Sequence, residues 1–142
     1  MGYANLMVTD VMSSQPICGK QWETVGKADA DMRLADIRHL PVVDERDHLL
    51  GILSDRDVGK ALARARGKSL RLDEVMTTDV LTVRPSTLAR EATWLMLDHK
   101  IGSLPVVDDQ QRLVGIVTET DFLRLAHQVL GGGVMASDEE AG

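Results

Sequence analysis

The chain has 142 residues, of which 44% are apolar, and a formal net charge of -6 at pH 7. This length allows one hydrophobic core or two small fused cores. Three acidic residues stand near the C-terminus, at Asp138, Glu139 and Glu140, and the basic residues are scattered rather than grouped with aromatic residues. These properties argue against DNA or RNA as a partner, because a nucleic-acid site needs a concentrated basic surface.

Cysteine usage and hydropathy exclude further classes. Cys18 is the only cysteine, so it forms no internal disulfide, and we interpret it as a small apolar residue in a strand. No apolar run is long enough to cross a bilayer, and residues 1–10 lack the basic and apolar regions of a signal peptide. His48, His99 and His127 have no co-ligands at metal-site spacing, so no metal is expected. A cytoplasmic protein without membrane contact is expected.

Two copies of one unit make up most of the chain. Leu-Pro-Val-Val-Asp occurs at Leu40–Asp44 and again at Leu104–Asp108, 64 residues later. Other identities at the same offset are Val11-Met12 with Val75-Met76, Gly51-Ile52 with Gly115-Ile116, and Asp57 with Asp121. Repetition of this kind indicates a duplicated structural unit.

The sequence of the first copy predicts a strand, a helix, two strands and a second helix. The strands are expected at residues 16–18, 40–43 and 49–53. Apolar residues at helical spacing predict the two helices, with Val25, Ala28, Met32 and Ala35 on one, and Val58, Ala61, Leu62 and Ala65 on the other. The segment before the first helix, Lys20-Gln21-Trp22, differs from Arg84-Pro85-Ser86 of the second copy, so the two helix starts are expected to differ.

The second copy repeats this order. Strands are expected at residues 80–83, 104–107 and 113–117, the last two joined by a polar turn. Ser86 or Thr87 is expected to cap the first helix through its hydroxyl. The first helix, ending near His99, would bury Leu88, Ala92, Leu95 and Met96, and the second, starting after Thr118, would bury Phe122, Leu125, Ala126 and Val129.

These elements predict an α+β fold of two tandem βαββα repeats. A repeat of about 60 residues with one three-stranded sheet is marginal alone. We therefore expect the two copies to pack sheet against sheet with pseudo-twofold symmetry. The predicted divisions are a first repeat with an N-terminal lead at 1–64, a linker at 65–71, a second repeat at 72–130 and a flexible acidic tail at 131–142.

Some apolar residues fall outside the predicted core faces. These are Trp94, Leu97, Leu123 and Leu130. Apolar stripes on the solvent side of helices more often mark a subunit contact than a cofactor site. We therefore expect a homodimer formed through helices.

A hydroxyl-x-x-Asp motif follows the last strand of each copy, at Ser54–Asp57 and at Thr118–Asp121. The motif has two interpretations. It is a capping-box pattern that needs no ligand, although the reciprocal box prefers the longer Glu or Gln. Alternatively, the short carboxylate accepts hydrogen bonds from ribose hydroxyls, and the hydroxyl and free helix amides meet a phosphate. The two roles are compatible.

The repeated motifs closely resemble the CBS domain, the family named after cystathionine β-synthase. The resemblance rests on Leu-Pro-Val-Val-Asp, a turn, Leu-Val-Gly-Ile-Val-Thr-x-x-Asp and an upstream Val-Met-Thr. Two tandem copies are similar to a CBS pair, or Bateman module, and the similarity covers about residues 5–130. It departs from the family pattern at Gly19–Glu23, which affects one pocket wall. Only a short lead and a tail remain outside, so a stand-alone CBS protein without an attached effector domain is expected.

The resemblance implies two ligand sites in the cleft between the copies, each joining the hydroxyl-x-x-Asp of one copy to the other copy. Site one would combine Ser54, Arg56 and Asp57 with Val80, Leu81, Gly102 and Ser103. Site two would combine Thr118 and Asp121 with Pro16, Ile17, Arg38 and His39. Arg38 and His39 offer positive charge to a phosphate in site two, or are simply a solvated helix end. We expect unequal sites, with site two preferring the more phosphorylated ligand.

The resemblance implies a regulatory function rather than an enzyme. The expected ligand is AMP, ADP or ATP, with S-adenosylmethionine or NAD as other adenosyl candidates, and no cofactor is obligatory. Binding would alter the contact with an effector protein that the sequence does not identify. The alternative is a ligand-free interaction scaffold with vestigial clefts, which the altered segment Gly19–Glu23 favours slightly and the two hydroxyl-x-x-Asp motifs oppose. No set of residues typical of nucleophilic catalysis is visible.

Overall fold

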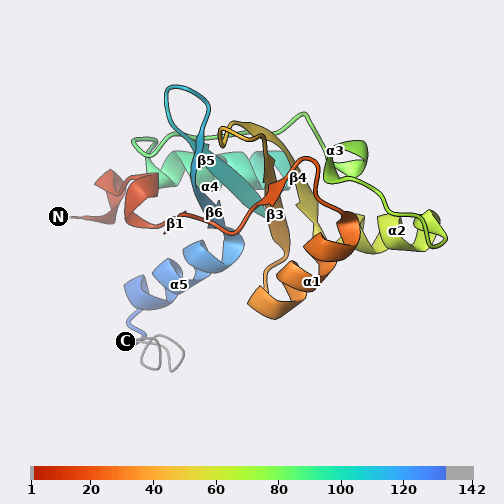
Figure 1. Cartoon of the computed structure of the whole chain (residues 1–142). Helices are drawn as coiled ribbons and strands as arrows, with labels where there is room; N and C mark the ends of the chain where they lie inside the picture. The colour runs from red at the N-terminus through yellow and green to blue at the C-terminus, as the bar shows by residue number, and fades with distance from the viewer. Residues whose placement is uncertain (1, 134–142) are drawn as a thin grey trace.

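The computed structural model describes residues 2–133, so most of the predicted acidic tail, residues 134–142, lies outside the described part. The fold is mixed α+β, with strands in the middle and helices around them (Figure 1). Within residues 2–133, no helix combines the length and the apolar character needed to cross a membrane. The elements are the 3-10 turns η1 (Tyr3–Asn5) and η2 (Val8–Asp10), strands β1 (Ser13–Ser14), β2 (Gly19–Lys20), β3 (His39–Val43), β4 (Leu49–Ser54), β5 (Ser103–Val107) and β6 (Leu113–Thr118), and helices α1 (Val25–Ala35), α2 (Asp55–Ala65), α3 (Leu72–Val75), α4 (Ala89–His99) and α5 (Glu119–Val129).

The predicted duplication is confirmed by the strand pairing. Antiparallel β3 and β4 pair from His39↔Ser54 to Val43↔Leu49, and β5 and β6 repeat this register 64 residues later, from Ser103↔Thr118 to Val107↔Leu113. Both pairs contain an irregularity at the same place, before the second valine of Leu-Pro-Val-Val-Asp. The four strands and four main helices lie where the periodicity predicts them.

The two repeats are related by a pseudo-twofold axis. The bridge between His48 and Arg112 joins equivalent positions and therefore lies on this axis. On either side of it, the Leu49 amide donates to the Gln111 carbonyl at 3.0 Å, and the Leu113 amide donates to the Asp47 carbonyl at 2.9 Å. The two turns thus exchange equivalent hydrogen bonds, as twofold symmetry requires.

Each repeat also gives its first residues to the other repeat. β1, from the start of the chain, pairs antiparallel with β6, so that the sheets have the orders β1-β6-β5 and β2-β3-β4. The symmetric counterpart is a bridge between Ile52 of β4 and Thr77, which follows α3. A second symmetric pair of bridges joins Met7 to Leu88 and Thr24 to Arg71. The sequence did not predict this exchange.

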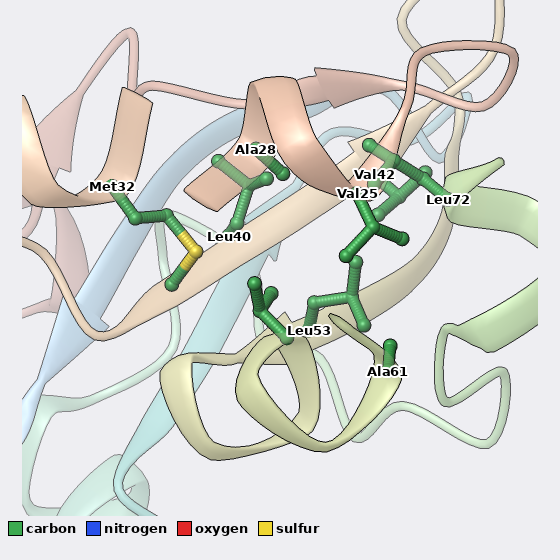
Figure 2. Packing of buried hydrophobic residues seen from close by; sticks show 9 residues of the cluster. Val25, Ala28, Met32, Leu40, Val42, Leu53, Ala61 and Leu72 are labelled. Atoms are coloured by element: carbon green, nitrogen blue, oxygen red, sulfur yellow. The ribbon is translucent and has the colours of Figure 1, made fainter. Parts of the chain in front are cut away.

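The hydrophobic cores follow the exchange rather than the sequence boundary. The first core contains Leu72 together with residues of α1, β3, β4 and α2, and Figure 2 shows Leu72 beside Val25 and Val42. The second core contains Val8 together with residues of α4, β5 and β6. Both Leu72 and Val8 are fully buried. The two repeats therefore complete each other and form one structural unit.

The first strand of each repeat differs from its prediction. Residues 16–18 form no strand, and pairing begins at β2, which runs parallel to β3. In the second repeat only Val83 of the predicted strand 80–83 pairs, through a parallel bridge to Val106. The weaker pairing of the second repeat has a visible cause at the next residues: the Gln21 amide donates to the Val43 carbonyl at 2.9 Å, whereas the equivalent Pro85 has no N–H to donate.

The helices differ from the predictions in two respects, the cap of α4 and the burial of α5. Thr24 caps α1, its hydroxyl accepting the Lys27 amide at 3.2 Å. In contrast, α4 starts after Leu88 without a side-chain cap, and the expected cap by Ser86 or Thr87 is wrong, because the Thr87 hydroxyl accepts the Arg84 amide instead. Helix α5 has no buried residue, whereas the equivalent α2 buries Val58, Ala61 and Ala65. Of the predicted α5 face, Phe122 packs against the second core, while Ala126 and Val129 are exposed.

Candidate functional site

A cavity of about 640 Å³ lies where the start of α5 meets the first repeat. Three segments line it: residues 13–17, which include β1, residues 36–39 at the start of β3, and residues 118–121 with Arg124 on α5. Gly102 and Ile116 complete the wall. A cavity of this size is within the range that holds a small-molecule ligand or cofactor.

The cavity brings together all six residues expected for site two. Thr118 and Asp121 come from the end of β6 and the first turn of α5, and Pro16, Ile17, Arg38 and His39 come from the first repeat. Pro16 and Ile17 reach the cavity because the chain crosses to β6 through β1 and then returns to β2. Their lack of strand pairing leaves the peptide groups of this segment at the cavity wall.

The residues expected for site one occupy the other side of the pseudo-twofold axis. Ser54, Arg56 and Asp57 stand at the start of α2, as their counterparts do at α5, and Leu81 packs against the second core. Gly102, a residue expected for site one, lines the site-two cavity. Its neighbour Ser103 is buried. Val80 is half-buried in the extended segment before Val83.

Both hydroxyl-x-x-Asp motifs form helix caps. At α2 the Ser54 amide donates to Asp57 Oδ2 at 3.2 Å, and the Asp57 amide donates to the Ser54 hydroxyl at 3.0 Å. At α5 the Thr118 amide and hydroxyl both donate to Asp121 Oδ2, at 2.8 and 3.2 Å. Asp57 therefore completes a reciprocal cap with Ser54, although such a cap prefers the longer Glu or Gln. Because the caps use Oδ2, Oδ1 of each carboxylate accepts no hydrogen bond within residues 2–133 and can meet a ligand.

Charges of both signs line the cavity. Arg38, His39 and Arg124 are the bases, and Asp36, Glu119 and Asp121 are the acids. Burial lowers the pKa of the His39 imidazole below its ordinary value of 6.5, and nearby Arg38 acts in the same direction, whereas the carboxylates of Asp55 and Glu119 oppose the shift.

Three charged residues of the cavity were missed in the sequence: Asp36, Glu119 and Arg124. Arg124 follows Asp121 by three positions on α5, which places both on one helix face. Glu119 is the first residue of the helix, and its amide donates to the Gly102 carbonyl at 3.1 Å. The helical period around Asp121 was a signal for Arg124, but no local pattern joins Glu119 to Gly102.

Cys18 lies just before β2 and lines a second, smaller cavity of about 210 Å³ with Pro16 and Asp47. Burial raises the pKa of its thiol. The prediction that Cys18 is a strand residue is wrong, since the strand starts one residue later. Among residues 2–133, no three His, Cys, Asp or Glu side chains are grouped so that they could hold a metal ion.

Comparison with known proteins identifies a recurring unit. The family model described as the CBS domain matches residues 8–64 and, again, residues 72–128. The chain is similar to an L-aspartate semialdehyde sulfurtransferase of Methanocaldococcus jannaschii, with 35% identity over 119 residues, which are 84% of this chain and 23% of that protein. It is also similar to an inosine-5'-monophosphate dehydrogenase of the same organism, with 38% identity over 84% of this chain and 22% of that protein. The chain thus spans less than a quarter of these relatives.

Solved structures agree over nearly the whole described fold. A Vibrio cholerae protein assigned to acetoin utilization (AcuB) gives a TM-score of 0.83 at 40% identity, covering 89% of this chain and 95% of that chain. The CBS domain pair of MJ0100, in complex with 5'-methylthioadenosine and S-adenosyl-L-methionine, gives 0.76 at 36% identity, covering 84% and 98%. CBSX2 in complex with AMP gives 0.77 at 29% identity, covering 87% and 98%.

Proposed function

Because the chain belongs to the CBS-domain family, with CBS domains at residues 8–64 and 72–128, we propose that it is a regulatory module that binds an adenosine compound. The observation that carries the proposal is the cavity at the start of α5, which gathers the six residues expected for site two. Proteins with similar structures were solved with AMP, or with 5'-methylthioadenosine and S-adenosyl-L-methionine. AMP, ADP and ATP are the first candidates here, and S-adenosylmethionine and NAD the next.

The cavity offers a partner for each part of such a ligand. Asp121 Oδ1 has no hydrogen-bond partner among residues 2–133 and can accept hydrogen bonds from the ribose hydroxyls. The apolar side chains of Pro16 and Ile17 suit the faces of an adenine ring, and the unpaired peptide groups around them suit its edge. Arg38, His39 and Arg124 suit a phosphate, because charge-assisted hydrogen bonds are about twice as strong as neutral ones.

We propose that the two sites are unequal. The pseudo-twofold axis relates Arg38 and His39 of site two to Gly102 and Ser103, which carry no charge. Arg56 offers partial compensation in site one, near Ser54 and Asp57. Site two should therefore prefer the more phosphorylated ligand, and equal affinity of both sites for AMP and for ATP would contradict this part of the proposal.

Ligand binding would act on another protein rather than on a substrate. The enzymes among the curated relatives share with this chain only their CBS part, which is 23% of the sulfurtransferase. Coupling between a ligand site and a protein contact is typically about 1–3 kcal/mol, which is about a five- to hundred-fold change in affinity. The rival proposal, a ligand-free scaffold, is favoured only by the altered segment Gly19–Glu23.

We also propose a homodimer formed through the helices of the second repeat. Apolar side chains exposed on α4 and α5 or just after α5 are Trp94, Leu97, Leu123, Val129 and Leu130. Light scattering should show a dimer that Leu123→Glu weakens. Gln128→Glu adds the same charge to an exposed position of α5 and should leave the dimer intact. A monomeric wild-type protein would contradict the proposal.

The decisive experiment is calorimetric titration of the purified protein with AMP, ADP, ATP, NAD and S-adenosylmethionine. Asp57→Ala and Asp121→Ala should each cost their site about 1.5–3 kcal/mol, roughly ten- to a hundred-fold in affinity, because a charged hydrogen bond to ribose is lost. Asp98→Ala, an exposed position outside the cavity, serves as the control. Asp121→Asn keeps a cap acceptor and separates ligand binding from helix stability. Absence of heat with every ligand would favour the scaffold.

A further inference from the structure

His39 and Glu119 come from different repeats, and both side chains lie beside Gly102. A Cβ atom placed on Gly102 would lie 3.3 Å from His39 Nε2 and 3.4 Å from Glu119 Oε1. The imidazole and the carboxylate thus flank one backbone position, and all three residues line the cavity. Glycine leaves room for this arrangement, because a Cβ at 102 would require the end of the His39 side chain to shift by a few tenths of an ångström and would touch Glu119.

The other side of the pseudo-twofold axis lacks this arrangement. The positions equivalent to His39, Glu119 and Gly102 hold Ser103, Asp55 and Arg38. Ser103 is 7% exposed, and its hydroxyl carries no charge near neutral pH. A titratable imidazole therefore belongs to the cavity at the start of α5 and not to its symmetric counterpart.

The groups around His39 have opposite effects on its protonation. Partial burial and the neighbouring Arg38 favour the neutral imidazole, while Asp55 at the start of α2 and Glu119 at the start of α5 favour the protonated form. Asp36, Asp121 and Arg124 also line the cavity. Because burial has the largest effect, the pKa of His39 lies below its ordinary value without a ligand. A phosphate beside the ring would add negative charge and favour the protonated form.

We propose that His39 takes up a proton when a phosphorylated adenosine compound binds in this cavity, so that the site holds such ligands more tightly as the pH falls. The proposal rests on the proposed function, since it needs an adenosine compound in the cavity. The sign follows from linkage: protonation that is stronger in the complex than in the free protein makes binding tighter at low pH. A neutral nucleoside brings no negative charge and should show little of this effect.

Proton uptake can be measured directly by calorimetry. AMP and adenosine are titrated in two non-phosphate buffers with different heats of protonation, at about pH 6 and about pH 8. Between about pH 8 and about pH 6, the affinity for AMP should rise about three- to ten-fold more in the wild-type protein than in His39→Gln. The phosphate of AMP also titrates in this range, but its contribution is common to both proteins, so the difference isolates His39. His48→Gln alters a half-buried histidine outside the cavity and should behave as wild type.

The outcomes separate this inference from the proposed function. Equal proton uptake by wild type and His39→Gln on binding AMP would overturn the inference alone, since AMP still binds. Failure of every ligand to bind wild type would overturn both. If His39→Gln fails to fold, NMR titration of the histidine ring protons of wild type, with and without AMP, gives the same answer: one ring must titrate at a higher pH in the complex. Unchanged titration of all rings that the NMR spectrum resolves would overturn the inference.

Discussion

Val8 and Leu72 occupy the same position in the two repeats, and each is fully buried in the core of the other repeat. Because the two repeats exchange these residues, the core of each repeat is complete only with a residue from the other repeat. The exchange also explains why the bridges between the repeats occur in symmetric pairs, since each crossing segment has a counterpart 64 residues away.

Leu72→Ala tests this exchange. The leucine contributes to the core of a repeat that ends before it in sequence, so its loss should lower the free energy of unfolding by about 2–5 kcal/mol. Leu34→Ala removes the same atoms from a side chain that is 90% exposed, and should change stability by less than about 0.5 kcal/mol. Denaturant unfolding measures both. Similar losses for the two variants would show that Leu72 does not complete the first core.

Gly115→Ala tests how closely the crossing segment approaches β6. A Cβ there would lie 2.5 Å from Met12 Sδ and 3.0 Å from the Ser13 carbonyl oxygen. That carbonyl belongs to β1, which is held by its pairing with Ile116, so it has little room to move. We expect a loss of about 1–3 kcal/mol in the free energy of unfolding from overpacking.

Gly59→Ala is the matched control for this prediction. Gly59 lies inside α2, and a Cβ there meets no atom within 4 Å. The substitution should stabilise the protein by about 0.5–1 kcal/mol, because alanine loses less backbone freedom in a helix than glycine does. The two Gly→Ala changes should therefore have opposite signs in the same unfolding assay, and a stable Gly115→Ala would contradict the close approach.

The repeat and the hydrophobic period predicted most of the secondary structure. β3 to β6 begin and end within one residue of the predicted strands, and helices α1, α2, α4 and α5 contain the predicted apolar faces except for Leu88 at the start of α4, because each element carries an apolar period or run of its own. The crossing of β1 to β6 was not predictable in this way. Ser13 and Ser14 are exposed and show no apolar alternation, and their pairing partner lies about a hundred residues further on.

The sequence motifs predicted part of the candidate site, and cavity residues outside those motifs were missed. The hydroxyl-x-x-Asp at Thr118–Asp121 and the family resemblance led to six cavity residues. Gly102, expected from the resemblance in site one, also lines the cavity of site two. The approach of His39 and Glu119 to Gly102 is a tertiary feature, and glycine left no pattern in the sequence that would reveal it.

We expect acid to destabilise the turn between β5 and β6, because the turn depends on the ionised carboxylate of Asp108. Its carboxylate accepts the Arg112 and Gln110 amides, each at 2.9 Å. These hydrogen bonds, led by that from Arg112, hold the pKa of Asp108 below its ordinary value of 3.8, although partial desolvation acts in the opposite direction. The contribution is present in full above that ordinary value, and it is lost as the pH falls through the lower pKa of the folded state.

Asp108→Asn makes this pH dependence measurable. Asparagine keeps an acceptor for the turn but does not titrate in acid, so the variant's free energy of unfolding should fall less steeply than that of wild type below about pH 4. Asp79→Asn, at an exposed position, controls for the loss of one negative charge. Parallel curves for wild type and Asp108→Asn would show that the turn does not depend on the ionised carboxylate.

Gly102→Ala should separate ligand binding from stability. Its Cβ would approach the ends of the His39 and Glu119 side chains at 3.3 and 3.4 Å, and both ends can move aside at little cost to folding. They would move within the cavity, however, and disturb the groups placed for a phosphate. We expect stability to change by less than about 1 kcal/mol, while AMP affinity falls about three- to thirty-fold, more than adenosine affinity does.

Leu72→Ala provides the converse case, because Leu72 lies in the first core and outside the cavity lining. At a temperature where both variants are folded, it should lower stability with a smaller effect on AMP affinity. If Gly102→Ala lowers stability as much as Leu72→Ala and leaves AMP affinity unchanged, Gly102 is a packing residue of the interface between the repeats. In that case the placement of His39 and Glu119 beside Gly102 would have no part in ligand selection.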